Sequence, residues 1–585
     1  MKKIFKNILA LILSLGTFTS CEDYLEVVPV SSFGPDYVFS NVTNATQALT
    51  GVYAALGGDH GYGIRLSMYY PLDDDIMMGQ GGNPFPDNER RDIAHYNAQP
   101  SNTQLRLPFN QLYLGIERAN ICIAEIPKMS MYQNGTEGEK RELRRLHGEA
   151  LALRAQFFFE LIRNWGDIPA QFEPSSTQND LFLERMDRDQ IYDKIIDDLG
   201  IAAEMLPWAT PGGSNERLTQ GAVRALRARF SLFRGGFSLR LDRQMKRGAD
   251  HLKYYTIARE ETQKIIQSGA HKLNPSFQSI FKDALLAKRR EPNGEILWEL
   301  AMTGGSSQFG DSKLGYYNGP RWNNLGNSAL TILPTFFYSF DPNDLRRDVT
   351  AAPYNINQDM TIVARTIQTI VDGKFRRDWI TNPTTFGSNA QYFNVNWPMI
   401  RYSDVLLMFA EADNEINNGP SPAAISALEE VRLRAFGGNA ALIGSTPTDY
   451  AGFFNAVVNE RAFELAGEGI RKYDLIRWNL LGTKLNETKA KLADMAQLKG
   501  EYANLPTVMY YEAEVNELRW VNSFYQPQPN QAPAGSASVA WAGNGINNTI
   551  LTYYAVGFTP GKSELLPLHT SILDANPKLK QEYGY

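Results

Sequence analysis

Hydrophobic residues recur at helical spacing along much of the chain. Val223, Leu226, Phe230 and Phe233 follow one another at intervals of three and four residues, and arginines occupy the other positions of the same helical wheel. The pattern recurs at Leu146, Ala150, Leu153, Phe157 and Leu161, and again at Val405, Phe409, Ala412 and Ile416. We therefore predict a helix in each of these three segments, with one face in the core and the other in water.

Weaker forms of this pattern predict further helices and a pairwise arrangement. The additional segments are residues 44–56, 108–126, 187–205, 252–268, 422–435, 453–466 and 470–480. Short turns such as Asn418-Gly419-Pro420 separate several of them, which favours antiparallel helix pairs stacked side by side, as in tetratricopeptide repeats. The strict 34-residue consensus of those repeats is absent. Between about 271 and 400, and after about 485, Gly, Asn, Pro and aromatic residues replace the helical pattern, which predicts long irregular loops.

The first twenty residues have the features of a lipoprotein export signal. Three lysines stand among the first six residues, residues 8 to 15 are apolar, and small residues lead to Cys21. Cleavage before Cys21 would leave a cysteine that carries lipid, followed by a tether to about residue 40. No later stretch reaches about eighteen uncharged apolar residues, so we expect the protein to be anchored to a membrane and not to cross it. An ordinary secretory signal with a coincidental cysteine is the alternative.

Composition narrows the class of protein. The 585 residues are 43% hydrophobic and 21% charged, which is typical of globular proteins. The formal net charge is −6, and no basic stripe is interleaved with aromatic residues, so we exclude nucleic acid as a partner. The second of the two cysteines, Cys122, lies in an apolar helical segment, where we expect a small buried hydrophobe, and no intrachain disulfide can form if Cys21 carries lipid.

The common enzyme motifs are absent from the sequence. There is no H-E-x-x-H, C-x-x-C, G-x-S-x-G or G-x-x-x-x-G-K motif, and the six histidines lack metal-ligand spacing. Asp73-Asp74-Asp75 could offer oxygen ligands to calcium, but we favour a solvated acidic loop.

One dense group of charges remains to be explained. Glu460, Glu464 and Glu468 share a helical face and would repel one another without cations nearby. The group comprises Glu460, Arg461, Glu464, Glu468, Arg471, Asp474, Arg477 and Trp478. We interpret it as a structural ion-pair network and not as an active site. Trp165-Gly166-Asp167-Ile168-Pro169 likewise predicts a helix that ends at glycine.

Four segments resemble the SusD/RagB-like outer-membrane lipoproteins of glycan-harvesting bacteria: residues 151–169, 396–415, 459–478 and 565–585. The last departs from the family pattern at Leu568-His569 and Glu582-Tyr583. The resemblance implies a mostly α fold with tetratricopeptide-like helix pairs, long irregular loops and minor β structure. It also implies an outer-membrane lipoprotein that faces the cell exterior, binds oligosaccharide without cleaving it, needs no cofactor, and delivers it to a TonB-dependent barrel transporter of the SusC kind.

These expectations divide the chain into regions and guide the choice of candidate ligand residues. After the signal (1–20) and tether (21–40), we expect one body at 41–585, helical at 41–270 and 401–481, loop-rich at 271–400 and mixed at 482–585. Sugar recognition needs aromatic faces together with carboxylates, amides and guanidinium groups. Two loops offer that mixture, one from Tyr69 to Asn97, which includes Arg90, and one from Phe309 to Asn324. The candidates in them are Tyr70, Asp73, Arg91, Tyr96, Asn97, Tyr316, Tyr317, Arg321, Trp322 and Asn323.

Burial in the core is the alternative for every aromatic residue. We assign Trp165, Trp298, Trp397 and Trp478 to the core and give the first ligand role to Trp322, because its neighbours are polar. The alternatives to oligosaccharide binding are peptide binding within the same family, a structural or adhesive helical-repeat protein, and a surface glycoside hydrolase.

Overall fold

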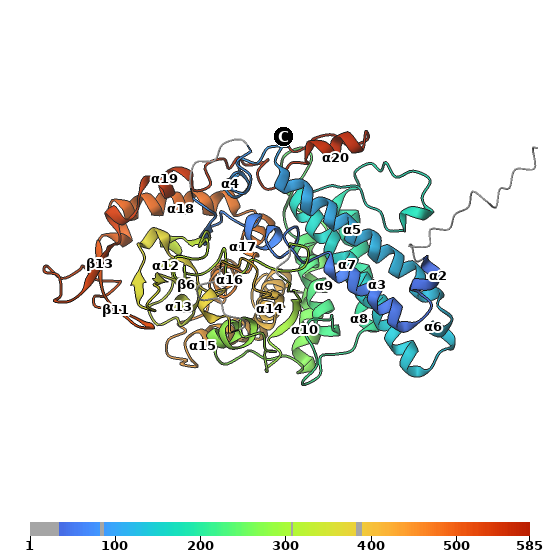
Figure 1. The fold of residues 1–585 in the computed structure, drawn as a ribbon, viewed down its shortest axis with the longest axis horizontal. Helices are drawn as coiled ribbons and strands as arrows, with labels where there is room; N and C mark the ends of the chain where they lie inside the picture. The colour runs from blue at the N-terminus through green and yellow to red at the C-terminus, as the bar shows by residue number, and fades with distance from the viewer. Residues whose placement is uncertain (1–33, 82–86, 303, 306–307, 382–388) are drawn as a thin grey trace, which may run out of the picture.

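The computed structural model describes residues 34–81, 87–302, 304–305, 308–381 and 389–585. The predicted export signal and Cys21 lie outside these residues. In Figure 1 the body is elongated: the helices that come first in the sequence gather at one end, and the C-terminal strands project from the other. The C-terminus lies at the upper edge of this view.

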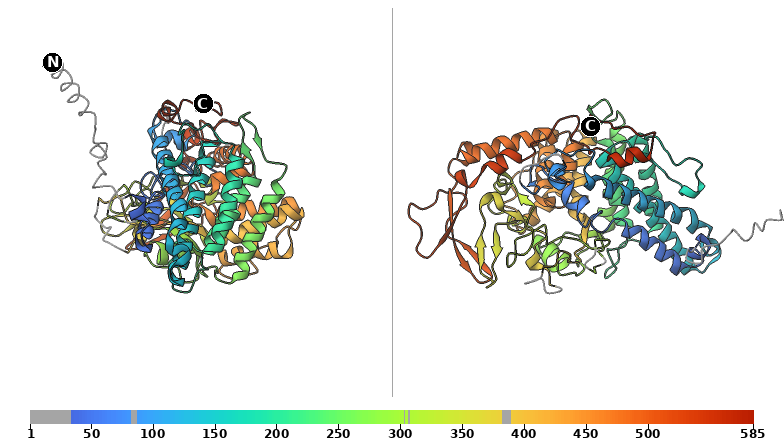
Figure 2. Two further views of the ribbon diagram at one scale, coloured as in Figure 1. Left: turned by 90° about the vertical axis from the view of Figure 1, so that its right-hand side faces the viewer. Right: turned by 45° about the horizontal axis from the view of Figure 1, so that its top comes forward.

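Consecutive helices stack on one another in the first half of the chain. They are α2 (Pro35–Val38), α3 (Val42–Ala54), α4 (Arg90–Ala94), α5 (Thr103–Glu125), α6 (Ser130–Asn134), α7 (Glu137–Trp165), α8 (Arg188–Met205), α9 (Gln220–Gly235) and α10 (His251–Ser268). Helix α5 packs on α7, α7 on α8, α8 on α9 and α9 on α10, and the left panel of Figure 2 shows them side by side. This is the predicted arrangement of tetratricopeptide-like helix pairs.

The residues at the two ends of helix α7 explain where the helix begins and where it ends. Thr136 and Glu139 form a capping box at its start, in which each side chain satisfies a backbone N–H of the other residue. The helix ends at Trp165, because Gly166 has φ +76°, a conformation that residues with a side chain rarely adopt. The predicted stop at glycine is confirmed. In the middle of the helix, Phe159 stacks on Phe230 of α9 with ring centroids 4.1 Å apart.

Among the described residues, the second half of the chain has four helices that were predicted and six that were not. They are α11 (Phe277–Ser279), α12 (Pro334–Phe337), α13 (Arg346–Thr350), α14 (Tyr402–Asn417), α15 (Pro422–Ala435), α16 (Tyr450–Leu465), α17 (Arg471–Arg477), α18 (Leu481–Ala496), α19 (Asn548–Tyr553) and α20 (Thr570–Ala575). The predicted end of the regular helices at about 485 was placed too early, because α18 continues to Ala496; the later described helices, α19 and α20, have six residues each. The buried face of α18 follows spacings of three and four residues and consists of Leu481, Leu485, Thr488, Leu492 and Met495.

Strands form small sheets between the helical parts. One sheet has the order β1 (Met77–Met78), β5 (Thr331–Ile332), β9 (Val371–Asp372), β6 (Ala351–Ala352), and another β12 (Glu517–Trp520), β11 (Val508–Glu514), β13 (Ala537–Ala540). Three antiparallel pairs join β2 (Ser238–Leu239) to β3 (Met245–Lys246), β4 (Ile296–Leu300) to β10 (Trp397–Arg401), and β7 (Tyr354–Ile356) to β8 (Ile362–Ala364). Short 3₁₀ or π turns lie at η2 (Arg65–Tyr69), η3 (Ile126–Lys128), η4 (Ser175–Thr177), η5 (Ile280–Leu285), η6 (Ile367–Thr369), η7 (Arg377–Trp379), η8 (Gly500–Tyr502) and η9 (Gly543–Gly545). The fold is therefore mostly α with minor β, as predicted.

The core assignments made from sequence are confirmed. Trp165, Trp298, Trp397 and Trp478 are all buried within one hydrophobic core that reaches from α3 to the C-terminal segment. Cys122 is buried in α5, and burial raises the pKa of its thiol to about 12, so it packs as a small protonated hydrophobe. None of the helices in the described ranges combines the length and apolar character that crossing a bilayer requires.

The charges around Glu464 form a buried ion-pair network, as predicted. Arg346 Nη1 lies 2.6 Å from Glu460, and Arg401 contacts Glu464 at 2.8 Å and Glu468 at 2.7 Å. Glu295, Lys374 and Arg434 belong to the same network, and a neighbouring set joins Asp404, Glu411, Arg461, Asp474 and Arg477. The network ties α16 to α13, α14, α17 and β10.

Candidate ligand-binding site

The two loops predicted from sequence meet in the structure. Tyr69 ends the turn η2, Arg90 begins α4, and Tyr317 lies in the second loop. The hydroxyl of Tyr69 donates a hydrogen bond of 3.2 Å to the hydroxyl of Tyr317, although 248 positions separate the two residues. Arg90 Nη1 donates to the same Tyr317 oxygen at 2.9 Å. Helix α4, which Arg90 begins, lies in the upper part of Figure 1.

The aromatic rings of this group pack around the guanidinium. Arg90 Cζ lies 5.2 Å from the ring centroid of Tyr317 and 5.9 Å from that of Tyr69, within the range of cation–π attraction. Tyr316 meets Tyr317 edge to face at 5.2 Å, and Arg90 Nε donates to Gln80 Oε1. We call Tyr69, Gln80, Arg90, Tyr316 and Tyr317 the Arg90 cluster.

The Arg90 cluster has the chemistry that sugar hydroxyls require. Tyr317 is buried, while the other four side chains are half-buried and so reach the surface. Burial and the neighbouring hydroxyl of Tyr69 raise the pKa of Tyr317, which keeps its phenol neutral and able both to donate and to accept. Within the described residues, Arg90 Nη2 makes no hydrogen bond and remains available as a donor. The cluster thus combines ring surface, a guanidinium, an amide and phenols.

Arg321, Trp322 and Asn323 form a separate group at strand β7. The Asn323 N–H donates to the carbonyl of Ile356 at 2.8 Å, and the Ile356 N–H donates to the carbonyl of Arg321 at 2.9 Å. Asn323 and Asn324 have φ of 52° and 61°, so the chain turns sharply here. Trp322 is half-buried and Arg321 is exposed. The backbone therefore holds this group against β7, and no described contact joins it to the Arg90 cluster.

Three of the predicted ligand residues lie in the core. Tyr70 and Asp73 are 1% and 0% exposed, and Tyr96 is 8% exposed. The Tyr70 hydroxyl donates to the carbonyl of Gln104 at 2.7 Å, and the Tyr96 hydroxyl donates to the carbonyl of Asp73. Because their polar atoms are satisfied inside the protein, we leave these three residues out of the site.

The remaining two candidates lie on or beside α4. Asn97 is half-buried, and its side-chain amide donates to Asp92 Oδ1 at 3.0 Å, so it holds the end of the helix. Arg91 is half-buried and follows Arg90 directly. No described contact joins either side chain to the Arg90 cluster, and consecutive residues of a helix face different sides.

The acidic triplet is not the solvated loop that we expected. Asp73 Oδ2 lies 2.7 Å from His95 Nδ1, and Asp74 Oδ1 accepts from two backbone N–H groups at 2.8 Å. Asp75 receives two hydrogen bonds from Arg471, both of 2.7 Å. Each carboxylate is thus committed to the fold. In the described ranges, no group of three or more His, Cys, Asp or Glu side chains could hold a metal ion.

Comparison with known proteins identifies the family of this chain. A family model described as "SusD family" matches residues 358–585, and one described as "Starch-binding associating with outer membrane" matches residues 23–232. The chain belongs to the SusD/RagB-like family. A SusD-like protein of Formosa agariphila is 24% identical, with 81% of this chain and 90% of that protein covered.

Solved structures show the same fold. A SusD homologue from Bacteroides thetaiotaomicron superimposes with a TM-score of 0.74 at 23% identity, covering 94% of this chain and 98% of the other. Surface glycan-binding protein A of the same organism, solved with laminarihexaose, gives a TM-score of 0.63 at 19% identity, with 92% and 99% covered.

The two family models leave residues 233–357 of this SusD-like chain unmatched. That interval contains Tyr316, Tyr317 and Trp322, so the second ligand loop lies outside both matches. From the sequence, Tyr69 and Arg90 were predicted only as members of the first loop, and Gln80 was not predicted as a ligand residue. Gln80 lies between Gly79 and Gly81, and its local sequence does not mark it as a ligand residue before the two loops are known to touch.

Proposed function

We propose that this SusD-like protein binds oligosaccharide through the Arg90 cluster, without cleaving it, and delivers it to a partner transporter of the TonB-dependent SusC kind. The meeting of Tyr69 and Arg90 with Tyr316 and Tyr317 carries the proposal, because two loops rich in aromatic side chains converge at one place. Ring surface contacts the apolar face of a sugar, while a guanidinium and phenols bond its hydroxyls. Relatives support the same ligand class, since one solved neighbour is described as laminarin-binding and another holds laminarihexaose.

Attachment to the outer membrane through Cys21 belongs to the same proposal. An acyl chain contributes on the order of 0.8 kcal/mol per buried CH₂, so several chains on one cysteine retain a large body at the membrane. Cells that make the Cys21→Ser variant test this directly. Recovery of that variant in the membrane fraction, with unchanged lipid labelling, would contradict it.

The ligand experiment uses purified mature protein and a panel of neutral oligosaccharides. We expect binding in the micromolar to millimolar range, about −8 to −4 kcal/mol, with no release of reducing ends. Tyr316→Ala removes a half-buried ring of the Arg90 cluster and should weaken binding about tenfold.

Tyr132→Ala is the matched control, because Tyr132 is also half-buried but lies in α6 at the far helical end. Equal affinities of the two variants would exclude the Arg90 cluster as the site. Release of reducing ends would support a hydrolase, binding of peptides alone a peptide carrier, and no binding at all an adhesive role.

A further inference from the structure

A polar cavity lies between the loop that joins α8 to α9, the C-terminal end of α10 and the loop that leads to β4. Its volume is about 930 Å³, within the usual range of ligand sites. Its lining includes Trp208, Arg224, Lys264, Lys272 and Arg290, and we call it the basic pocket. It shares no residue with the Arg90 cluster.

The basic pocket is lined by four cations and by no carboxylate. Two of the cations are neutralised from outside the lining, because Arg224 and Lys264 contact Glu261 at 2.6 and 3.2 Å. Lys272 and Arg290 form no ion pair with any residue that the structure describes. Arg290 Nη2 instead donates to the carbonyl of Thr210 at 3.0 Å, which fixes its guanidinium at the wall. An anion entering the pocket would therefore meet positive charge that no internal carboxylate neutralises.

The positive surface continues beyond Arg290 into an adjoining cavity of about 390 Å³. Lys288 and Arg289 line that cavity and, within the described parts of the chain, also lack an ion-pair partner. Glu216 and Glu299 oppose them, but burial raises the pKa of Glu299 to about 7, so part of its negative charge is lost at neutral pH. The two cavities share Arg290, so a ligand longer than a single small ion could contact cations in both.

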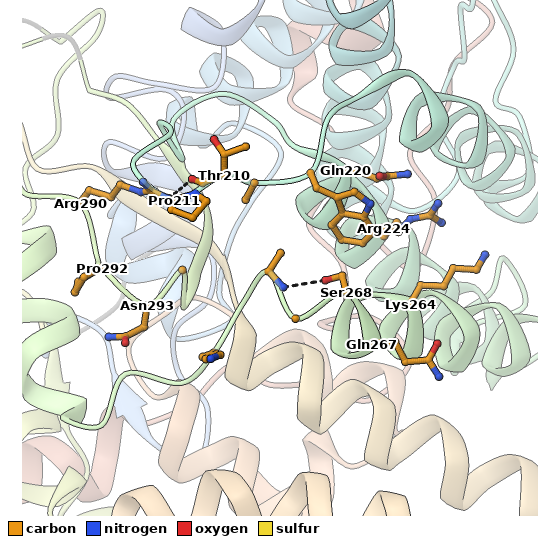
Figure 3. A pocket seen from close by; sticks show the side chains of 16 residues that line it. Thr210, Pro211, Gln220, Arg224, Lys264, Gln267, Ser268, Arg290, Pro292 and Asn293 are labelled. Carbon is orange, nitrogen blue, oxygen red and sulfur yellow. Dashed lines mark hydrogen bonds between the residues drawn. The ribbon is translucent and has the colours of Figure 1, made fainter.

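The other groups in the basic pocket suit a sugar. Trp208 is half-buried, and the guanidinium carbon of Arg224 lies 6.0 Å from its ring centroid. In Figure 3, Arg290 and Asn293 lie on one side of the cavity, with Lys264 and Gln267 across from them. An aromatic ring and side-chain amides recognise sugar rings and hydroxyls, whereas cations recognise acidic substituents.

We infer that the basic pocket is a second binding site, for oligosaccharides that carry carboxylate or sulfate groups. Two unpaired cations on a wall that also holds an aromatic ring and amides favour an acidic sugar over a neutral one. This site is independent of the Arg90 cluster, so it can exist whether or not that cluster binds neutral glycan.

The test compares Lys272→Gln with the unmodified protein, using an oligogalacturonate for the carboxylate form and a sulfated galactan oligosaccharide for the sulfate form. Lys272 is exposed and makes no side-chain bond in the described structure, so its replacement should leave the fold intact. We expect titration calorimetry to show about fivefold weaker binding of at least one acidic sugar and a steep loss of wild-type affinity with added salt. Lys499→Gln, at an exposed lysine outside the pocket, should bind like the wild type.

Several results would overturn the inference. Among them are equal binding by Lys272→Gln and wild type, equal affinity for a neutral oligosaccharide of the same length, and inorganic sulfate that binds as tightly as the sugars. Binding to vesicles of phosphatidylglycerol without binding to either acidic sugar would assign the pocket to a lipid surface and reject it as a sugar site. The outcome of Tyr316→Ala with neutral glycans is separate, because that variant leaves the basic pocket unchanged.

Discussion

Arginine plays opposite parts in the buried ion-pair network and in the surface sites of this protein. In the network, Arg401 faces three carboxylates, with contacts of 2.8 Å to Glu295, 2.8 Å to Glu464 and 2.7 Å to Glu468. In the Arg90 cluster, the guanidinium faces phenols and an amide. In the basic pocket, Arg290 faces a carbonyl. An arginine whose charge is paired with buried carboxylates stabilises the fold. An arginine near the surface that has no carboxylate partner among the described residues is available to a ligand.

The pKa values follow the same division. Burial alone would raise the pKa of Glu464, but the guanidinium groups of Arg434, Arg401 and Arg346 hold it well below its usual value. Tyr317 has no charged partner strong enough to ionise it, so its pKa is raised and it stays a neutral hydrogen-bonding group. Glu464 therefore stays ionised at neutral pH, whereas the Arg90 cluster offers a ligand neutral phenols beside one guanidinium.

The largest expected effect comes from breaking the network. Arg401→Met would leave Glu295, Glu464 and Glu468 buried with too few cations, which should lower the free energy of unfolding by about 3–5 kcal/mol. Arg401→Lys keeps the charge but loses the bidentate contacts, so its stability should fall between those of Arg401→Met and wild type. Urea unfolding followed by circular dichroism measures both changes.

Arg519→Met provides the surface control for this experiment. Arg519 pairs with Glu512 on the exposed strands β11 and β12, where the same chemical change should leave the unfolding midpoint unaltered. If Arg401→Met and Arg519→Met shifted the midpoint equally, burial would not be what distinguishes the network.

Acid should weaken the network through Asp404. Burial would raise its pKa, but Arg461 and Arg229 hold the pKa at about 2, below the ordinary value of 3.8. Because the folded state binds this proton less tightly than the unfolded state, the stabilisation is present above about pH 4 and is lost as the pH falls toward 2. Its size is about 2 kcal/mol. The stability difference between wild type and Asp404→Asn should shrink by that amount between about pH 5 and pH 2, and a constant difference would contradict the pairing.

Local patterns predicted the helices well because the signal for a helix lies within a few turns. The predicted segment 422–435 coincides with α15, and 252–268 misses only the first residue of α10. Helix α5 begins at Thr103 and not at Pro108, because the Asn102 side chain caps it one turn earlier. Helix α18 was not predicted, although its apolar residues follow helical spacing, because Gly482 and Asn486 lie among them and weaken the pattern.

The site was harder to predict because its contacts are between residues distant in the sequence. The sequence predicted a solvated Asp75, whereas in the structure Asp75 pairs with Arg471, which lies 396 positions away in the sequence. Tyr96 and Tyr317 are both buried, but the Tyr96 hydroxyl donates to the carbonyl of Asp73, whereas the Tyr317 hydroxyl meets Tyr69 and Arg90. Composition thus located the loops, and only the fold decides which side chains in them face a ligand.

The smallest expected effect concerns Trp322, and it tests how far the proposed sugar site extends. Its ring is half-buried at β7, and no described contact links it to the Arg90 cluster. Trp322→Ala should therefore leave the circular dichroism spectrum unchanged and weaken neutral glycan binding only about threefold, less than Tyr316→Ala. Unchanged affinity in isothermal titration would confine the site to the Arg90 cluster. A loss larger than that of Tyr316→Ala would instead move the main platform to β7, because the indole of Trp322 would then contribute more binding energy than the rings around Arg90.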